Sequence, residues 1–175
     1  MQKTVITFGL ISGFTLAILW YATTSFWIDD NGRMDFSKGE LFGYINMIVA
    51  LSMIFFGIRQ YRERHLGGKI TFGKAFKVGI LITLIASAIY VIGWMIYFHT
   101  SEVAQTFPVQ YLDHMKAKWA ASGISPEEIN QKAMGFEKNM ELYKNPIVMA
   151  GMTLMEIFPV GLLVTLISAL ILKRR

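Results

Sequence analysis

Four long apolar stretches alternate with polar segments along the chain. The stretches cover residues 5–28, 41–58, 78–99 and 147–172. A helix that crosses a bilayer needs about 20 mainly apolar residues, so each stretch has close to the required length. The pattern predicts an all-α fold, a bundle of four transmembrane helices that forms a single membrane domain over residues 1–175.

The polar segment between the third and fourth stretches, residues 100–146, is the only one large enough for a module outside the membrane. Gly123 separates two helical patterns of apolar residues, and Ser125 followed by Pro126 supplies an N-cap and a first-turn proline for the second helix. We therefore expect an extracytoplasmic helical hairpin between transmembrane helices 3 and 4. Its two apolar faces consist of Phe107, Tyr111, Met115 and Trp119, and of Ile129, Ala133, Phe136, Met140 and Tyr143.

These two faces have two interpretations. In the simpler one, they pack against each other and only hold the hairpin together. In the other, Tyr111 and Trp119 belong to a surface that binds a partner or lies on lipid headgroups, for which amphipathic aromatic residues are well suited.

Composition supports a membrane protein, since 54% of the residues are hydrophobic and the mean hydropathy is +0.44. The start of the chain has features of a secretory signal, with Lys3 before an apolar run and small residues near Ala22. The run continues through Trp27 and Ile28, however, whereas a signal core has about 7–15 residues. We expect an uncleaved first helix. In that helix Gly9 and Gly13 form a small-xxx-small pair, for which helix packing is a sufficient explanation.

The formal net charge of +5 is unevenly distributed. Ten basic residues lie in the N-terminal tail, in residues 59–77 and in residues 173–175, whereas the short connection 29–40 has two. The positive-inside bias then predicts that both termini are cytoplasmic. Because the positive charge lies beside predicted membrane ends, we expect membrane lipids as partners and no nucleic acid.

The basic segment 59–77 is itself a candidate site. Lys69, Lys74 and Lys77 are candidate contacts for anionic lipid headgroups, with Ile70, Phe72 and Phe76 expected to lie in the interface. The simpler interpretation is an orientation signal alone. The glycines of this segment lack the G-x-x-x-x-G-K-[ST] order of a nucleotide-binding loop.

Glu156 is the one clearly intramembrane acid, about ten residues or roughly 15 Å into the last stretch. Charged side chains at mid-membrane cost about 2.5–3.5 kcal/mol, so such an acid needs a partner. Counting to the same depth reaches Asn46 and Tyr90, which with Glu156 and the helix-kinking Pro159 form a candidate intramembrane polar site. A kinked helix with a mid-depth acid is typical of transporter sites. A hydrogen-bonded structural acid is the simpler interpretation.

Other chemistry is sparse. The chain has no cysteine, its three histidines are scattered, and neither an H-E-x-x-H pair nor a G-x-S-x-G elbow occurs. We therefore predict no catalytic residues, no metal site and no cofactor, and a protein that is not an enzyme.

Several short motifs resemble one family along nearly the whole chain. They are KTV at 3–5, GLISG at 9–13, IFFGIR at 54–59, TFGKAFKVG at 71–79 and EIFPVG at 156–161. In these the chain resembles the DUF4199 family, small multi-pass membrane proteins found mostly in Bacteroidota. The resemblance implies a protein of the bacterial inner membrane with unknown function, and it carries no established site residues.

Two functions remain open. The favoured one is a non-enzymatic association or accessory protein that acts through its outer hairpin and basic cytoplasmic loop on lipids, on another membrane protein or on a second copy of itself. The alternative is a small oligomeric transporter or ligand-binding membrane protein that uses Glu156. A lipid-modifying enzyme is disfavoured because no catalytic motif is found.

Overall fold

A computed structural model describes residues 1–174, and the helices within them account for most of the chain. Four helical units, residues 2–26, 36–65, 72–100 and 146–172, are long and apolar enough to cross a membrane. The predicted all-α fold with four candidate membrane-spanning helices is therefore confirmed. Arg175, part of the basic C-terminal segment, lies outside the described residues. In chain order the elements are α1 (Gln2–Thr23), the 3₁₀ helix η1 (Thr24–Phe26), α2 (Phe36–Leu51), α3 (Met53–His65), α4 (Phe72–Thr100), α5 (Glu102–Ala121), α6 (Pro126–Tyr143) and α7 (Pro146–Leu172).

The second, third and fourth helical units extend beyond the apolar stretches from which they were predicted, whereas the first ends at Phe26, short of the predicted residue 28. The second unit begins at Phe36 because the Asp35 side chain accepts a hydrogen bond from the Lys38 amide at 3.1 Å. Thr71 accepts one in the same way from the Lys74 amide and starts α4. Capping residues determine where a helix begins, whereas hydropathy marks only its apolar part.

The second membrane unit is interrupted at Ser52, between α2 and α3. The Ser52 hydroxyl donates to the Val49 carbonyl at 2.6 Å, and the Phe55 amide bonds the Ser52 carbonyl three residues back. A serine that bonds the preceding turn competes with the helical ladder and bends the helix. Helices α2 and α3 therefore form one helical unit with a tight turn at Ser52.

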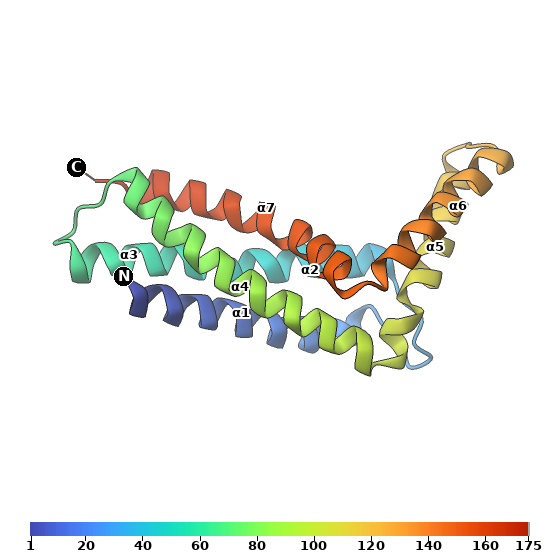
Figure 1. Cartoon of the computed structure of the whole chain (residues 1–175), viewed down its shortest axis with the longest axis horizontal. Coiled ribbons are helices and arrows are strands. Elements are labelled where there is room, and N and C mark those ends of the chain that lie inside the picture. Colours follow the sequence, from blue (N-terminus) through green and yellow to red (C-terminus); the bar gives the residue numbers. More distant parts are fainter. Residues whose placement is uncertain (175) are drawn as a thin grey trace.

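Helix α4 is the central helix and packs against α1 on one side and α7 on the other (Figure 1). Gly9 of α1 lies against Ile85 of α4, where an added Cβ would come within 2.6 Å of the Ile85 Cβ. Gly13 lies against Ile89, one turn further along. Small residues let helix backbones approach closely in a membrane. The Gly9 and Gly13 pair therefore packs within the chain, as expected.

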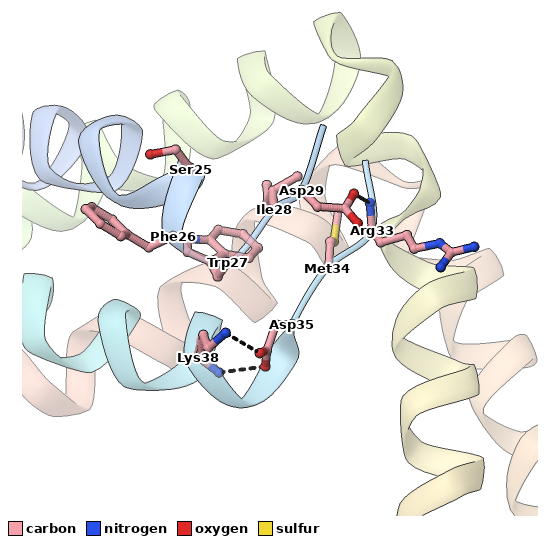
Figure 2. A pocket seen from close by; sticks show the side chains of 9 residues that line it. All are labelled: Ser25, Phe26, Trp27, Ile28, Asp29, Arg33, Met34, Asp35 and Lys38. Atoms are coloured by element: carbon pink, nitrogen blue, oxygen red, sulfur yellow. Dashed lines mark hydrogen bonds and ion pairs between the residues drawn. The ribbon is translucent and has the colours of Figure 1, made fainter. Parts of the chain in front are cut away.

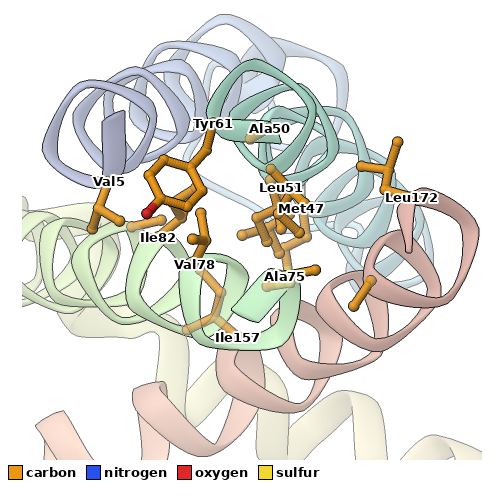
Figure 3. Close-up of a cluster of buried hydrophobic side chains, with 14 of the residues drawn as sticks. Val5, Met47, Ala50, Leu51, Tyr61, Ala75, Val78, Ile82, Ile157 and Leu172 are labelled. Atoms are coloured by element: carbon orange, nitrogen blue, oxygen red, sulfur yellow. The ribbon is translucent and has the colours of Figure 1, made fainter. Parts of the chain in front are cut away.

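The interior of the bundle combines apolar packing with a few hydrogen bonds between helices. Figure 3 shows apolar side chains from α1, α2, α3, α4 and α7 converging on this interior. The buried Ser12 hydroxyl donates to the Ala50 carbonyl at 2.8 Å, and the hydroxyls of Thr83 and Thr165 lie 3.0 Å apart. These bonds connect α1 to α2 and α4 to α7 without exposing a polar group to lipid.

Both termini and the connection between α3 and α4 lie at the same end of the bundle (Figure 1). Ile70 and Arg174 exchange two backbone hydrogen bonds of 3.0 and 2.9 Å. The Arg62 guanidinium donates to the Leu172 carbonyl at 3.1 Å, which satisfies one of the free carbonyls at the end of α7. The C-terminal tail is therefore attached to the α3–α4 connection.

Helices α5 and α6 form a hairpin at the opposite end of the bundle (Figure 1). Gly123 takes a φ of +78° between them, and the Ser125 side chain caps α6. The base of the hairpin is anchored by Gln110, whose side-chain nitrogen donates to the Gly32 carbonyl at 2.9 Å while its oxygen accepts from the Met34 amide at 2.9 Å. The hairpin is thus fixed to the connection between α1 and α2.

Candidate functional site

Glu156 and Tyr90 lie side by side at the same depth of the bundle. Glu156 is ten residues from the start of α7 and Tyr90 ten residues from the end of α4, so each lies about 15 Å from the hairpin end of its helix. The two helices run antiparallel and pack against each other, which places the Tyr90 hydroxyl near the Glu156 carboxylate. This pairing was one half of the site predicted from depth alone.

Three further residues extend this pair towards the hairpin. The indole nitrogen of Trp94 donates to the Tyr143 hydroxyl at 2.6 Å, which links α4 to the last turn of α6. Tyr143 is also close enough to Thr153 and Glu156 for both to influence its hydroxyl. We call Tyr90, Trp94, Tyr143, Thr153 and Glu156 the outer polar cluster.

The surroundings of Tyr143 raise the pKa of its hydroxyl, which is neutral at neutral pH even at its usual value. Partial burial raises the pKa of Tyr143 above its usual value, and the nearby Glu156 carboxylate also raises it. The hydrogen bond from Trp94 acts in the opposite direction without cancelling the effect of burial. Tyr143 therefore remains a donor and an acceptor at neutral pH.

The structure places Asn46 elsewhere. Its side-chain amide donates to the Thr23 hydroxyl at 2.9 Å, and Asn46 is buried between α2 and α1. Depth along a helix does not determine the direction of a side chain, and on α2 this position faces α1. Pro159 is exposed on α7, which continues without a break to Leu172. Gly161, two residues on, lies against Thr83. The cluster is thus built around Tyr90 and Glu156, with neither Asn46 nor Pro159 bonded to it.

Sequence reasoning missed Trp94, Tyr143 and Thr153 as members of one cluster. Tyr143 belongs to one of the predicted hairpin faces, whereas Trp94 lies in the third predicted membrane helix. They lie 49 residues apart, on different sides of a turn whose geometry no periodicity specifies. Only the fold of the α6–α7 junction brings Tyr143 back to α4.

Glu156 is covered by Tyr90 on one side and exposed on the other. The neighbouring Met155 and Met152 are 74% and 46% exposed, so this strip of α7 lies on the outer surface of the bundle. None of the ion pairs found within residues 1–174 involves Glu156. A carboxyl group in this position can take up a proton, interact with a cation or accept a hydrogen bond from a partner.

A cavity of about 300 Å³ lies between the end of α1 and the start of α2 (Figure 2). Its charged residues serve the local fold. Asp29 accepts from the backbone amides of Asn31 and Arg33, at 2.9 and 2.8 Å, and so closes the turn. The backbone amide and side chain of Lys38 lower the pKa of Asp35, which caps α2. Because these carboxylates are used in turns and caps, the cavity offers no free catalytic pair.

The basic connection between α3 and α4 presents its lysines to the surroundings. Lys69, Lys74 and Lys77 are exposed, and Phe72 is 38% exposed beside them. Ile70 is instead 2% exposed, because its backbone pairs with Arg174 and its side chain joins the core. Of the apolar residues expected at the interface, Phe72 is thus the most accessible, whereas Phe76 is half-buried against the core.

Tyr111 and Trp119 lie within the hairpin. The Tyr111 ring is 5.6 Å from the Phe136 ring of α6 and 5.3 Å from the Phe36 ring of α2. Lys132 places its ammonium group 5.8 Å from the centre of the Trp119 ring. These contacts favour the packing interpretation for both residues. The exposed apolar side chains of the hairpin are different ones, namely Val109, Met134 and Leu142.

Four helices that are long and apolar enough to span a bilayer, with hydrogen bonds between helices in the interior, indicate an all-helical membrane protein. The family model described as protein of unknown function (DUF4199) matches residues 7–174, nearly the whole chain. The chain therefore belongs to the DUF4199 family. Comparisons with curated proteins and with solved structures give no significant match. The family assignment agrees with the fold and does not indicate an activity.

Proposed function

We propose that this protein resides in the bacterial inner membrane, with both termini in the cytoplasm and the α5–α6 hairpin outside it. The basic segments support this orientation, because the fold gathers the termini and the α3–α4 connection at one end of the bundle. The connection between α1 and α2, which carries four acids and two basic residues, lies at the other end with the hairpin. Basic residues are retained on the cytoplasmic side.

The chain has no cysteine, which makes this orientation directly measurable. Single cysteines at the exposed positions Asn130 and Arg64 would report the hairpin and the basic end. We expect a membrane-impermeant maleimide to label Asn130→Cys in intact spheroplasts and Arg64→Cys only after lysis. Labelling in the reverse order would overturn the orientation.

For function, we infer a non-enzymatic role in association with another membrane protein. This inference rests on the hairpin, which is anchored at its base by Gln110 and yet exposes apolar side chains along its length. Val109 is 65%, Met134 62% and Leu142 55% exposed. Exposed apolar groups on a segment that projects into water are typical of interaction surfaces. The exposed lysines at the other end support contact with anionic lipids, at about 1 kcal/mol for each basic residue.

The test is purification from native membranes in a mild amphiphile, followed by native mass spectrometry. We expect a stoichiometric protein partner that is lost from the Val109→Glu, Met134→Glu double variant. Both positions are exposed, so hairpin helicity should be unchanged. The matched control places the same charges at the exposed polar positions Gln105 and Asn130 and should retain the partner. Equal capture by both double variants, or the isolation of lone subunits from wild type, would contradict the association role.

A second function is favoured by the outer polar cluster. An exposed acid beside a tyrosine, at a depth of about 15 Å, suits a ligand or ion site in an oligomeric transporter or ligand-binding protein. This function requires flux in liposomes, or ligand binding, that depends on Glu156. Glu156→Gln with unchanged flux and binding would exclude it.

A further inference from the structure

The C-terminal tail and the connection between α3 and α4 form one structural unit at the end of the bundle that carries the termini (Figure 1). The Ile70 amide donates to the Arg174 carbonyl at 3.0 Å, and the Arg174 amide donates to the Ile70 carbonyl at 2.9 Å. Two residues before Arg174, the Leu172 carbonyl accepts from the buried Arg62 guanidinium at 3.1 Å. These bonds hold residues 172–174 beside residues 69–71.

This pairing places basic side chains of both segments on one face. Successive side chains of an extended segment point in opposite directions. The Ile70 side chain is 2% exposed and points into the core, whereas its neighbours Lys69 and Thr71 are exposed. In this antiparallel pairing the residue opposite Thr71 is Lys173, and such residues have Cβ atoms about 5 Å apart. Lys173 is exposed as well, so Lys69 and Lys173 lie on the same outward face.

The first two turns of α4 add two more cations beside this face. Thr71 caps the helix, and Lys74 and Lys77 follow at about 3 and 8 Å along its axis. Both lysines are exposed. Phe72 is 38% exposed next to them, and its ring stacks on the Phe76 ring with centroids 6.0 Å apart. The surface thus has a cationic part and an adjoining aromatic part.

The positive charges of this surface are not compensated by the described part of the chain. We call its basic residues the tail patch, which consists of Lys69, Lys74, Lys77, Lys173 and Arg174. None of the ion pairs found within residues 1–174 involves a member of the patch. Glu63, the one acid within residues 59–77, is bonded by Arg62 instead, whose Nε donates to the Glu63 Oε1 at 3.0 Å. Uncompensated positive charge gathered on one face attracts anions.

The tail patch lies at the level of lipid headgroups. The 29 residues of α4 span about 44 Å, whereas the hydrocarbon core of a bilayer is roughly 30 Å thick. The first turns of α4 therefore reach the headgroup region when the helix crosses the membrane. The phosphates of anionic lipids lie at this depth, and basic residues beside a membrane helix attract them. Aromatic side chains such as Phe72 are suited to the boundary between headgroups and acyl chains.

We propose that the tail patch binds the phosphate of an anionic phospholipid, and that the pairing of the C-terminal tail with the α3–α4 connection builds this site. Lys69 and Lys173 contact the phosphate from the two paired segments, and Lys74 and Lys77 contact it from α4. The acyl chains then lie against the aromatic part of the surface, beside Phe72.

This inference deepens the proposed contact with anionic lipids, because it assigns the C-terminal tail to that contact. It rests on the proposed placement of this end of the bundle at a membrane surface, which labelling of Arg64→Cys tests separately. It does not require a protein partner of the hairpin. Failure of the lipid site would leave both the labelling pattern and the partner unchanged, so the two kinds of failure are distinguishable.

The experiment adds phosphatidylglycerol, and separately phosphatidylcholine with the same acyl chains, to the delipidated protein and resolves each bound lipid by native mass spectrometry. We expect the first phosphatidylglycerol to bind more tightly than the first phosphatidylcholine. Lys69→Gln combined with Lys173→Gln should weaken that first phosphatidylglycerol step at least roughly tenfold, because each basic residue adds to the attraction of anionic lipid. Phosphatidylcholine binding should not change. Equal affinities of wild type for the two lipids would overturn the proposal.

The matched control removes two lysines from the hairpin. Lys118 and Lys138 are exposed, and no ion pair found within residues 1–174 involves them. Lys118→Gln combined with Lys138→Gln changes the net charge by the same amount at the other end of the molecule, so phosphatidylglycerol binding should stay at the wild-type level. A similar loss in both double variants would indicate a general effect of net charge and overturn the site.

Arg174 separates the effect of the pairing from the effect of charge. Arg174→Gln removes the charge and keeps the backbone amide that donates to Ile70, whereas Arg174→Pro removes both. The position is exposed and follows the last helix, so both variants should fold. We expect the proline variant to bind phosphatidylglycerol several-fold more weakly than the glutamine variant, because a released tail no longer holds Lys173 beside Lys69. Equal binding by the two variants would overturn the role of the tail pairing.

Discussion

The half of the bundle next to the termini, called here the inner half, and the half next to the hairpin, the outer half, are packed by different means. In the inner half, small residues bring the helices together, with Gly79 of α4 against Thr165 and Gly161 of α7 against Thr83. In the outer half, the large rings of Trp20, Trp94 and Tyr97 contact one another and line a cavity between α1 and α4. Close backbone contact leaves no space between helices, whereas aromatic residues that pack imperfectly leave a cavity. We therefore expect substitutions in the inner half to cost more stability than substitutions beside the cavity in the outer half.

The largest effect is expected at the glycines of the inner half. Gly161→Leu places a side chain where Thr83 already lies, and overpacking of this kind should destabilise the fold by about 3 kcal/mol. Gly151→Leu is the control on the same helix, because its Cβ meets no atom within 4 Å. Unfolding in mixed micelles measures both. Similar stability of the two variants would contradict close packing of α4 on α7.

A smaller effect is expected from the hydrogen bond that joins the hairpin to the bundle. Trp94→Phe removes the donor to Tyr143 and keeps an aromatic ring, so we expect a loss of about 1 kcal/mol and faster amide exchange in α6. Trp27→Phe offers a comparison at a tryptophan outside the cluster. Unchanged exchange in α6 with Trp94→Phe would show that the junction is held by packing alone.

The hydrogen bond between Thr83 and Thr165 should contribute less. Such bonds in membrane proteins average about 0.6 kcal/mol, and Thr83→Val keeps the shape of the side chain. A double-mutant cycle with Thr165→Val isolates the pair term from the effect on packing. A coupling energy near zero would show that the inner half is stabilised by close contact alone.

The smallest effect is a pH dependence at Tyr143. Burial raises the pKa of Tyr143 in the folded state above the value of about 10 in the unfolded state. The folded state therefore holds its proton longer, and this contribution to stability is complete below about pH 10 and is lost as the pH rises through the raised pKa. Tyr143→Phe should reduce the loss of stability in that alkaline range. An identical alkaline profile for the variant would contradict the burial of this hydroxyl.

Sequence reasoning predicted the features that depend on local composition. The number of membrane helices, the N-cap at Ser125 and the helix break at Gly123 follow from apolar periodicity and turn chemistry over a few residues. The family resemblance also agreed, with a match over residues 7–174. These features depend little on what the rest of the chain does.

Contacts between helices depended on the rotation of each helix about its axis, which depth alone does not determine. Tyr90 and Asn46 lie at similar predicted depths, yet Tyr90 meets Glu156 and Asn46 meets Thr23. The sequence by itself thus determined the helices, the charge asymmetry and the presence of one acid, Glu156, within a predicted membrane helix. Only the tertiary structure decided which side chains surround that acid, because close packing of α4 on both α1 and α7 sets the direction in which each residue points.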